Sequence, residues 1–154
     1  MEIIINYEVF SDASQLDVSD RLLISKAIHA SDKAYAVYSK FHVGAALLLE
    51  DGDIITGSNQ ENIAYPSGLC AERTVLFFTG ANYADKRIIS LAIFGTGDLL
   101  EGNGPVTPCG SCRQVMAESI LRQNAGFELL LVGADGKIVK FKNALDLLPL
   151  PFGI

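Results

Sequence analysis

The sequence contains no run of about 18 consecutive apolar residues, which excludes a membrane-spanning helix. Basic residues are few, because 12 Lys and Arg stand against 18 Asp and Glu and give a formal net charge of −6. Such a chain repels phosphate backbones and anionic lipids, so nucleic acids and membranes are poor partners. The stretch 1–6 lacks the basic flank and apolar core of a secretory signal, and we therefore expect a cytoplasmic protein.

Cysteine is also scarce, with only Cys70, Cys109 and Cys112 in the chain. An odd number of cysteines cannot pair completely within one chain, and a reducing compartment disfavours structural disulfides. The three thiols are therefore either core residues or metal ligands, and their neighbours must distinguish the two.

Repeats, low-complexity tracts and linker-like shifts of composition are absent from the 154 residues. Apolar residues make up 49% and charged residues 19%, proportions that exclude intrinsic disorder. We therefore expect residues 1–154 to form a single domain. The stretch 1–16 is ambiguous, because it fits an N-terminal arm, within which residues 3–10 fit a loose segment or an extra strand.

Hydrophobic periodicity and turn signals predict an alternation of helices and strands. Helices are expected from a cap at Asp17 to about Ala36, from near Cys70, and from near Cys109 to an end before Gly126, which we take as a C-cap glycine. Strands are expected at 43–49, 54–56, 88–94, 127–132 and 137–141, with hairpin turns at Asp51-Gly52 and Asp135-Gly136 and a short helical turn at 144–147.

This element order indicates an α/β fold with three α/β/α layers and a mixed five-stranded sheet. The third helix follows one buried strand and precedes another in the sequence, so we expect it to connect two parallel strands by a right-handed crossover. Helices should then cover both faces of the sheet.

Two short segments, Cys70–Arg73 and Pro108–Gln114, contain all three cysteines. Each places its first cysteine at the expected start of a helix, where unpaired N–H groups and the positive dipole end stabilise a thiolate. Cys109 and Cys112 are three residues apart, which brings both sulfurs to one side of the first turn. Three thiolates leave one tetrahedral position of a zinc ion open, as in catalytic rather than structural sites.

Glu72 and Arg73 complete the first segment. The offset of Glu72 from Cys70 turns its side chain away from a ligand position, so we predict a proton shuttle whose burial holds its pKa up. Three thiolates on a divalent ion leave one net negative charge, which Arg73, with Arg113 as a second candidate, would offset by donating hydrogen bonds to the sulfurs.

Each of these residues also has an ordinary interpretation. A single Cys-x-x-Cys pair fits a redox dithiol or buried core cysteines, Glu72 alone fits a solvated helix carboxylate, and Arg73 alone fits a surface charge. Their combination at two expected helix starts favours a metal site.

The segments Cys-Ala-Glu-Arg and Pro-Cys-Gly-Ser-Cys-Arg-Gln resemble those of the zinc-dependent cytidine deaminases of the small homotetrameric kind. The resemblance extends to the segments 38–47, 57–62 and 147–153, and it covers about residues 17–153. The segment before Asp17 has no counterpart in the family, and Val37 stands where the family often has proline.

The resemblance implies Zn²⁺ as cofactor, with Cys70, Cys109 and Cys112 as ligands and Glu72 as the proton shuttle. The resemblance also implies the residues that bind the nucleoside. Asn59 and Glu61 would hydrogen-bond the ribose, chiefly its 3′-hydroxyl, and Phe41 would pack against the nucleoside. The backbone of Ala71 would contact the pyrimidine edge, and Phe152 would close a site. The family's arrangement has Phe152 closing a site in a neighbouring subunit, so the resemblance also implies a homotetramer.

The expected reaction is hydrolytic deamination of cytidine, and of 2′-deoxycytidine, to the uridine nucleoside and ammonia, a step of pyrimidine salvage. A clamp on a free 3′-hydroxyl would leave no room for a continuing nucleic-acid strand, which agrees with the net charge of −6. Two alternatives stay open. One is a related deaminase acting on another cytosine nucleoside, such as blasticidin S, and the other is a zinc-stabilised or dithiol protein without hydrolase activity.

Overall fold

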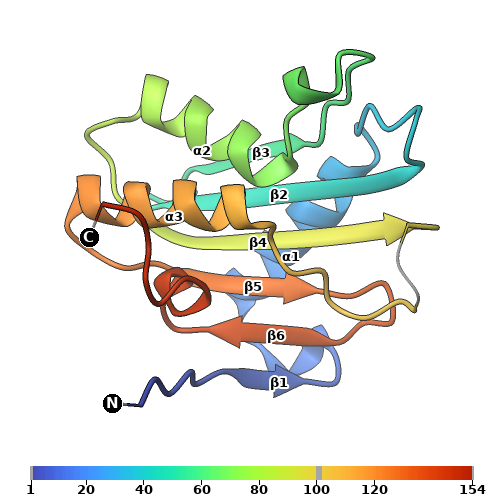
Figure 1. Cartoon of the computed structure of the whole chain (residues 1–154). Helices are drawn as coiled ribbons and strands as arrows, with labels where there is room; N and C mark the ends of the chain where they lie inside the picture. Colours follow the sequence, from blue (N-terminus) through green and yellow to red (C-terminus); the bar gives the residue numbers. More distant parts are fainter. Residues whose placement is uncertain (1, 100–101, 154) are drawn as a thin grey trace.

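A mixed sheet with the strand order β1-β6-β5-β4-β2-β3 forms the centre of the computed structural model, which describes residues 2–99 and 102–153 (Figure 1). Its strands are β1 (Glu8–Phe10), β2 (Phe41–Leu49), β3 (Ile54–Ser58), β4 (Ile88–Gly97), β5 (Glu128–Val132) and β6 (Ile138–Phe141). The helices are α1 (Val18–Ser31), α2 (Ala71–Asn82) and α3 (Gly110–Gln123), with single 3₁₀ turns at Ala13–Gln15, Tyr65–Ser67 and Ala144–Leu147. Among the described helices, none combines the length and apolar character needed to cross a membrane.

The helices cover both faces of this sheet, α1 behind it and α2 with α3 in front (Figure 1). Alternate strand residues separate into two cores. Ala46, Ala92 and Leu130 pack with α1, whereas Leu47, Leu91 and Leu129 pack on the face of α2 and α3. The predicted three-layer α/β/α arrangement is therefore confirmed.

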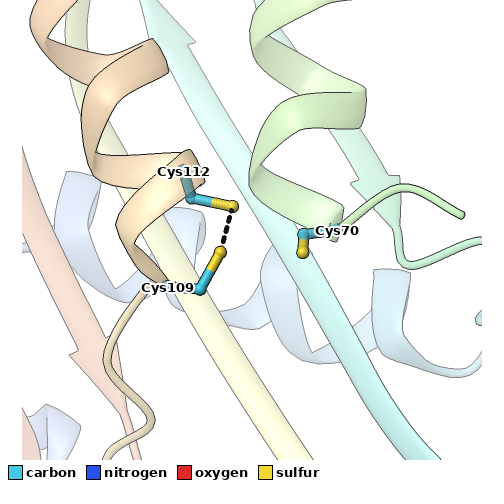
Figure 2. Close-up of side chains that lie close together, drawn as sticks. All are labelled: Cys70, Cys109 and Cys112. Carbon is cyan, nitrogen blue, oxygen red and sulfur yellow. Dashed lines mark hydrogen bonds between the residues drawn. The ribbon is translucent and has the colours of Figure 1, made fainter. Parts of the chain in front are cut away.

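The connection from β4 through α3 to β5 determines where the second cysteine segment lies. β4 and β5 are parallel neighbours, with Ala92 opposite Leu130, as predicted. The other neighbouring strands pair antiparallel. In an α/β sheet the helix that follows a strand begins beyond that strand's carboxyl end, where ligand sites form. The starts of α2 and α3 lie side by side over the front face of the sheet (Figures 1 and 2).

The sheet has six strands in the described residues, so the prediction of five was wrong. The additional strand is β1, which pairs antiparallel with β6 and sets Val9 opposite Val139. Without it, β6 would present a row of unpaired N–H and C=O groups at the edge of the sheet. Tyr7 lies against Phe141 with ring centroids 5.6 Å apart, which strengthens the attachment of this segment. The ambiguous N-terminal stretch therefore includes a strand.

One predicted helix end and one predicted helix cap were also wrong. α1 ends at Ser31 rather than near Ala36, because Tyr35 instead pairs through its backbone with Asn59 and Glu61. α3 ends at Gln123, and Asn124, with a left-handed φ of 51°, takes the C-cap position that had been assigned to Gly126. Both differences arise from contacts or caps that helical periodicity does not encode.

Gly44 marks a close approach of β2 to α1. A Cβ atom at this position would lie 2.0 Å from the carbonyl oxygen of Ala27 and 2.4 Å from the backbone nitrogen of Ser31. Because backbone atoms cannot rotate away, we expect Gly44→Ala to destabilise the fold by about 3 kcal/mol and to lower Tm by roughly 10 °C.

Thermal denaturation of Gly44→Ala beside Gly104→Ala tests this expectation. A Cβ at Gly104 would meet no atom within 4 Å, so this control should keep the wild-type Tm. Equal Tm values for the two variants would contradict the close approach of α1 and β2.

Candidate metal centre and active site

The first cysteine of each segment is the N-cap residue of a helix, in agreement with the sequence-based expectation. Cys70 precedes α2 with φ −70° and ψ 153°, and Cys109 precedes α3 with φ −66° and ψ 167°. Neither side chain makes a capping hydrogen bond to its own helix, so both sulfurs are free to face outward from the helix ends. The positive ends of two helix dipoles consequently meet at the cysteines.

The three sulfurs form one cluster, with all Sγ atoms within 4.8 Å of one another. Figure 2 shows Cys70 at the start of α2, beside Cys109 just before α3 and Cys112 on the first turn of α3. The Sγ atoms of Cys109 and Cys112 are 3.5 Å apart, and all three residues are free cysteines. Cys112 is buried, Cys70 half-buried and Cys109 exposed, so the cluster has one side open.

The charges of the cluster are coupled. A hydrogen bond with Cys112, and a weaker one with Arg73, lower the pKa of Cys70 to about 5. The same bond to Cys70, together with burial, raises the pKa of Cys112. The thiolate of Cys70 therefore forms more readily than that of Cys112.

Arg73 supplies part of the positive charge, because its Nη2 lies 3.5 Å from the sulfur of Cys70. Its Nε is buried and has no hydrogen-bond partner in the described part of the chain, so the guanidinium has a donor left for further negative charge. The expected contact of Arg73 with a sulfur is thus present.

Arg113 behaves differently from the expectation. Its Nε donates to the carbonyl oxygen of Pro108 at 2.8 Å and its Nη1 to that of Leu147 at 3.1 Å. Those two carbonyl groups, rather than a sulfur, are its partners. Arg113 thereby fixes the backbone just before Cys109 and ties α3 to the C-terminal segment.

The donor set suits zinc. Thiolates are soft ligands that Zn²⁺ binds at about 2.3 Å, which places tetrahedral sulfurs roughly 3.8 Å apart. The sulfur separations in this cluster, 3.5 Å for one pair and no more than 4.8 Å for all, need only a small adjustment to reach that geometry. Three protein ligands would also leave one coordination position open.

Glu72 lies in the first turn of α2 and is only 5% exposed, which rules out the ordinary interpretation as a solvated helix carboxylate. Burial, and then the negative charge of Cys70, raise the pKa of Glu72. The carboxyl group can therefore hold a proton beside the sulfur cluster under conditions in which an exposed glutamate is ionised.

Asn59 and Glu61 line a cavity of about 150 Å³ that also includes Cys70 and Tyr65. Two predicted nucleoside-binding residues thus share a cavity with one cysteine of the cluster. The position follows from backbone pairing, because Gln60 bridges to Leu69, the residue before Cys70. Ala71, the first residue of α2 and the chain neighbour of Cys70, is fully buried and does not line this cavity.

The same two side chains also hold the start of β2 and the turn that precedes it. Asn59 accepts from the backbone nitrogen of Val43 at 2.8 Å and donates to the carbonyl oxygen of Phe41 at 2.9 Å. The carboxylate of Glu61 accepts hydrogen bonds from the backbone nitrogen and the hydroxyl of Ser39. The bond from the hydroxyl is the main cause that lowers the pKa of Glu61. Sequence analysis missed Ser39, although it lies within the family-like segment 38–47.

Phe41 and Phe152 are not brought to this cavity within the chain. Phe41 is half-buried at the start of β2, beside Gly95 and Val106. Phe152 is 89% exposed, while its backbone nitrogen and oxygen both bond to the side chain of Gln114 at 3.0 Å. The side chain of Phe152 therefore points away from the chain that carries it, and the contacts of Gln114 were not foreseen.

Comparison with known proteins identifies the family. Residues 17–124 match the family described as "Cytidine and deoxycytidylate deaminase zinc-binding region". A cytidine deaminase of Halalkalibacterium halodurans is 49% identical over 98 residues, covering 64% of this chain and 70% of that protein. One of Mycobacterium tuberculosis is 39% identical over 142 residues, covering 90% of this chain and 92% of the relative.

A crystal structure of cytidine deaminase from Burkholderia pseudomallei superposes with a TM-score of 0.72 at 41% identity, over 85% of this chain and 97% of that one. The matched family region contains all three cysteines and Glu72. Since that region is zinc-binding by description and the sulfur cluster fits zinc, Zn²⁺ is the cofactor. The chain belongs to the cytidine and deoxycytidylate deaminase family of zinc-binding proteins.

Proposed function

We propose that this chain hydrolyses cytidine, and 2′-deoxycytidine as well, to the corresponding uridine nucleoside and ammonia in pyrimidine salvage. The observation that carries the proposal is the buried carboxyl of Glu72 at the start of α2, beside three free sulfurs within 4.8 Å of one another. A closed structural zinc site would need a fourth protein ligand, and no fourth Cys, His, Asp or Glu belongs to the cluster in the described residues.

In this proposal Cys70, Cys109 and Cys112 hold the zinc ion, with Arg73 offsetting their negative charge. Zinc, when bound, supplies a Lewis acid that makes water nucleophilic near neutral pH. The open side of the cluster at Cys109 is consistent with an approaching substrate.

Glu72 performs the proton transfers. Its carboxylate takes a proton from the attacking water and delivers it to ring N3 while the water oxygen adds to C4. It then takes the remaining hydroxyl proton and passes it to the amino group, so that the C4–N4 bond breaks and ammonia leaves. Its burial supports this role, because desolvation raises the pKa of the carboxyl group and makes its carboxylate a stronger base.

Asn59 and Glu61 bind the ribose in this proposal, chiefly its 3′-hydroxyl, and the backbone of Ala71 meets the pyrimidine edge. Asn59 offers both a donor and an acceptor, and Glu61 offers acceptors, which suits a diol. Their position on the cavity beside Cys70 supports the assignment. Phe41 packs against the nucleoside.

We also propose a homotetramer in which Phe152 closes the site of a neighbouring subunit, in a cytoplasmic setting that keeps the three thiols reduced. A phenyl ring that is 89% exposed on an anchored backbone supports this idea, because such a ring is available to a partner. Phe152→Ala should raise the KM for cytidine about tenfold, through the loss of a buried aromatic contact.

Steady-state kinetics and native mass spectrometry check the prediction for Phe152. Leu150→Ala is the matched control, since Leu150 is 84% exposed on the same tail and has no proposed role. A fully active monomer, or unchanged kinetics of Phe152→Ala, would rule out completion of the site by a neighbouring subunit.

The proposed activity is tested by the loss of cytidine absorbance together with ammonia release, with and without a chelator. Turnover that stops on chelation and returns with Zn²⁺ is expected. A panel of cytosine nucleosides that includes blasticidin S tests the alternative substrate. Efficient turnover of blasticidin S without turnover of cytidine would contradict the proposal in favour of that alternative. If the zinc-loaded protein releases no ammonia from any substrate of the panel, the non-catalytic alternative is favoured.

A further inference from the structure

The turn that leads into β2 is built around the carboxylate of Glu61. One carboxylate oxygen accepts from the backbone nitrogen of Tyr38 at 2.9 Å and from that of Ser39 at 3.3 Å. The other oxygen accepts from the hydroxyl of Ser39. Glu61 is thus held by three donors, of which one is a side chain.

The hydroxyl of Ser39 makes a second contact, because it accepts a hydrogen bond from the backbone nitrogen of Phe41 at 3.0 Å. A single side chain therefore connects Glu61 to the first residue of β2. Lys40, which lies between the two, has a left-handed φ of 56°. That conformation is costly for a residue with a Cβ atom, so the turn needs contacts such as those of Ser39 to hold it.

The other end of the same peptide segment is held by Asn59, whose amide donates to the carbonyl oxygen of Phe41 at 2.9 Å. Ser39 and Asn59 thus fix Phe41 from both sides of its backbone. Because Asn59 and Glu61 also line the cavity beside Cys70, the contacts of Ser39 reach the wall of that cavity through Glu61.

We propose that Ser39 is a positioning residue for nucleoside binding, whose hydroxyl prearranges the carboxylate of Glu61 and the start of β2. The proposal rests on the function proposed above and concerns the ribose side of that site. Ser39 itself does not line the cavity in the described residues. A side chain held in its binding orientation loses less conformational freedom when the ligand arrives, so prearrangement appears as affinity.

The Ser39→Ala variant isolates this contribution. It removes the hydroxyl, whereas the two backbone N–H donors to Glu61 remain, so the chain should still fold and bind zinc. The expected result is a KM for cytidine about tenfold higher, with kcat changed less than about threefold, because the lost interaction acts on binding and not on the chemical step. Calorimetry with uridine should show a Kd weakened by a similar factor, without any need for turnover.

A substrate pair separates positioning from general damage to the fold. Ser39→Ala should reduce the preference for cytidine over 3′-deoxycytidine by about threefold or more, because the hydroxyl acts through the residue that contacts the 3′-hydroxyl. Ser39→Thr, which keeps the hydroxyl, should restore KM and this preference. Ser14→Ala is the matched control, since the hydroxyl of Ser14 bonds to the carboxylate of Asp12 in the N-terminal segment.

If Ser39→Ala shows the same KM, uridine Kd and substrate preference as the wild type, the positioning role is overturned and the proposed function stays intact. A KM that rises equally for both substrates and is not rescued by Ser39→Thr would also overturn it, because general loosening would then explain the effect. An absence of cytidine turnover in the unmodified chain would instead overturn the proposed function, and this inference with it.

Discussion

Replacing Glu72 with glutamine lowers the kcat for cytidine by about three to four orders of magnitude, while the zinc content remains that of the wild type. Glutamine keeps the size and polarity of the buried side chain but cannot accept and release a proton. General acid–base groups contribute roughly 10²–10⁴-fold. We expect the upper part of that range because the same carboxyl group is proposed to serve water, ring nitrogen and leaving group in turn.

Single-turnover kinetics together with metal analysis measure this effect. Glu118→Gln, a change of the same kind at an exposed position of α3, is the control and should behave as wild type. Retention of more than about a tenth of the wild-type kcat in Glu72→Gln would show that another group transfers the protons.

Replacing Cys112 with alanine removes zinc and much of the stability of the fold. Cys112 is fully buried in the core between α3 and the sheet, and its sulfur belongs to the cluster formed at the starts of α2 and α3. A metal that binds only the folded state stabilises it by mass action, so the variant loses that contribution as well as a packed side chain. We expect a zinc content below about a tenth of wild type and a Tm lowered by roughly 10 °C or more.

Denaturation of the wild type in chelator separates the two causes for Cys112→Ala. If the metal dominates, the chelated wild type falls to nearly the Tm of the variant. If packing dominates, chelation changes the wild type little. A variant that binds zinc in the wild-type amount would exclude Cys112 as a ligand.

Most of the elements around the site could be predicted from the residues, because their signals are local. Near-continuous apolar runs identified β2, β4 and β5, and the two cysteine segments coincided with the starts of α2 and α3. The strand count was wrong because β1 depends on the free edge of β6, and the end of α1 was wrong because Tyr35 pairs with a distant loop. Such contacts join segments far apart in the chain and leave no periodic pattern.

The candidate site shows the same division. Cys-Ala-Glu-Arg already indicated a thiolate with a charged partner, and Arg73 does contact Cys70. The neighbouring Arg113 carried the same chemical signal but bonds to carbonyl groups, because its place on α3 turns it toward Pro108 and Leu147. Side-chain direction was not readable from residue type, and Ser39 was missed for the same reason.

The sequence by itself determined which groups this protein can use: three thiols at helix starts, one neighbouring carboxyl and a chain too acidic to favour nucleic acid. Only the tertiary structure decided that the sulfur of Cys70 lies close to those of Cys109 and Cys112. It also decided that Glu72 is buried and that Glu61 accepts hydrogen bonds from the turn before β2. The physical reason is that ionisation and metal affinity depend on distance and desolvation. Both quantities arise when α2, α3 and the loop before α2 pack together, and neither is a property of any single segment.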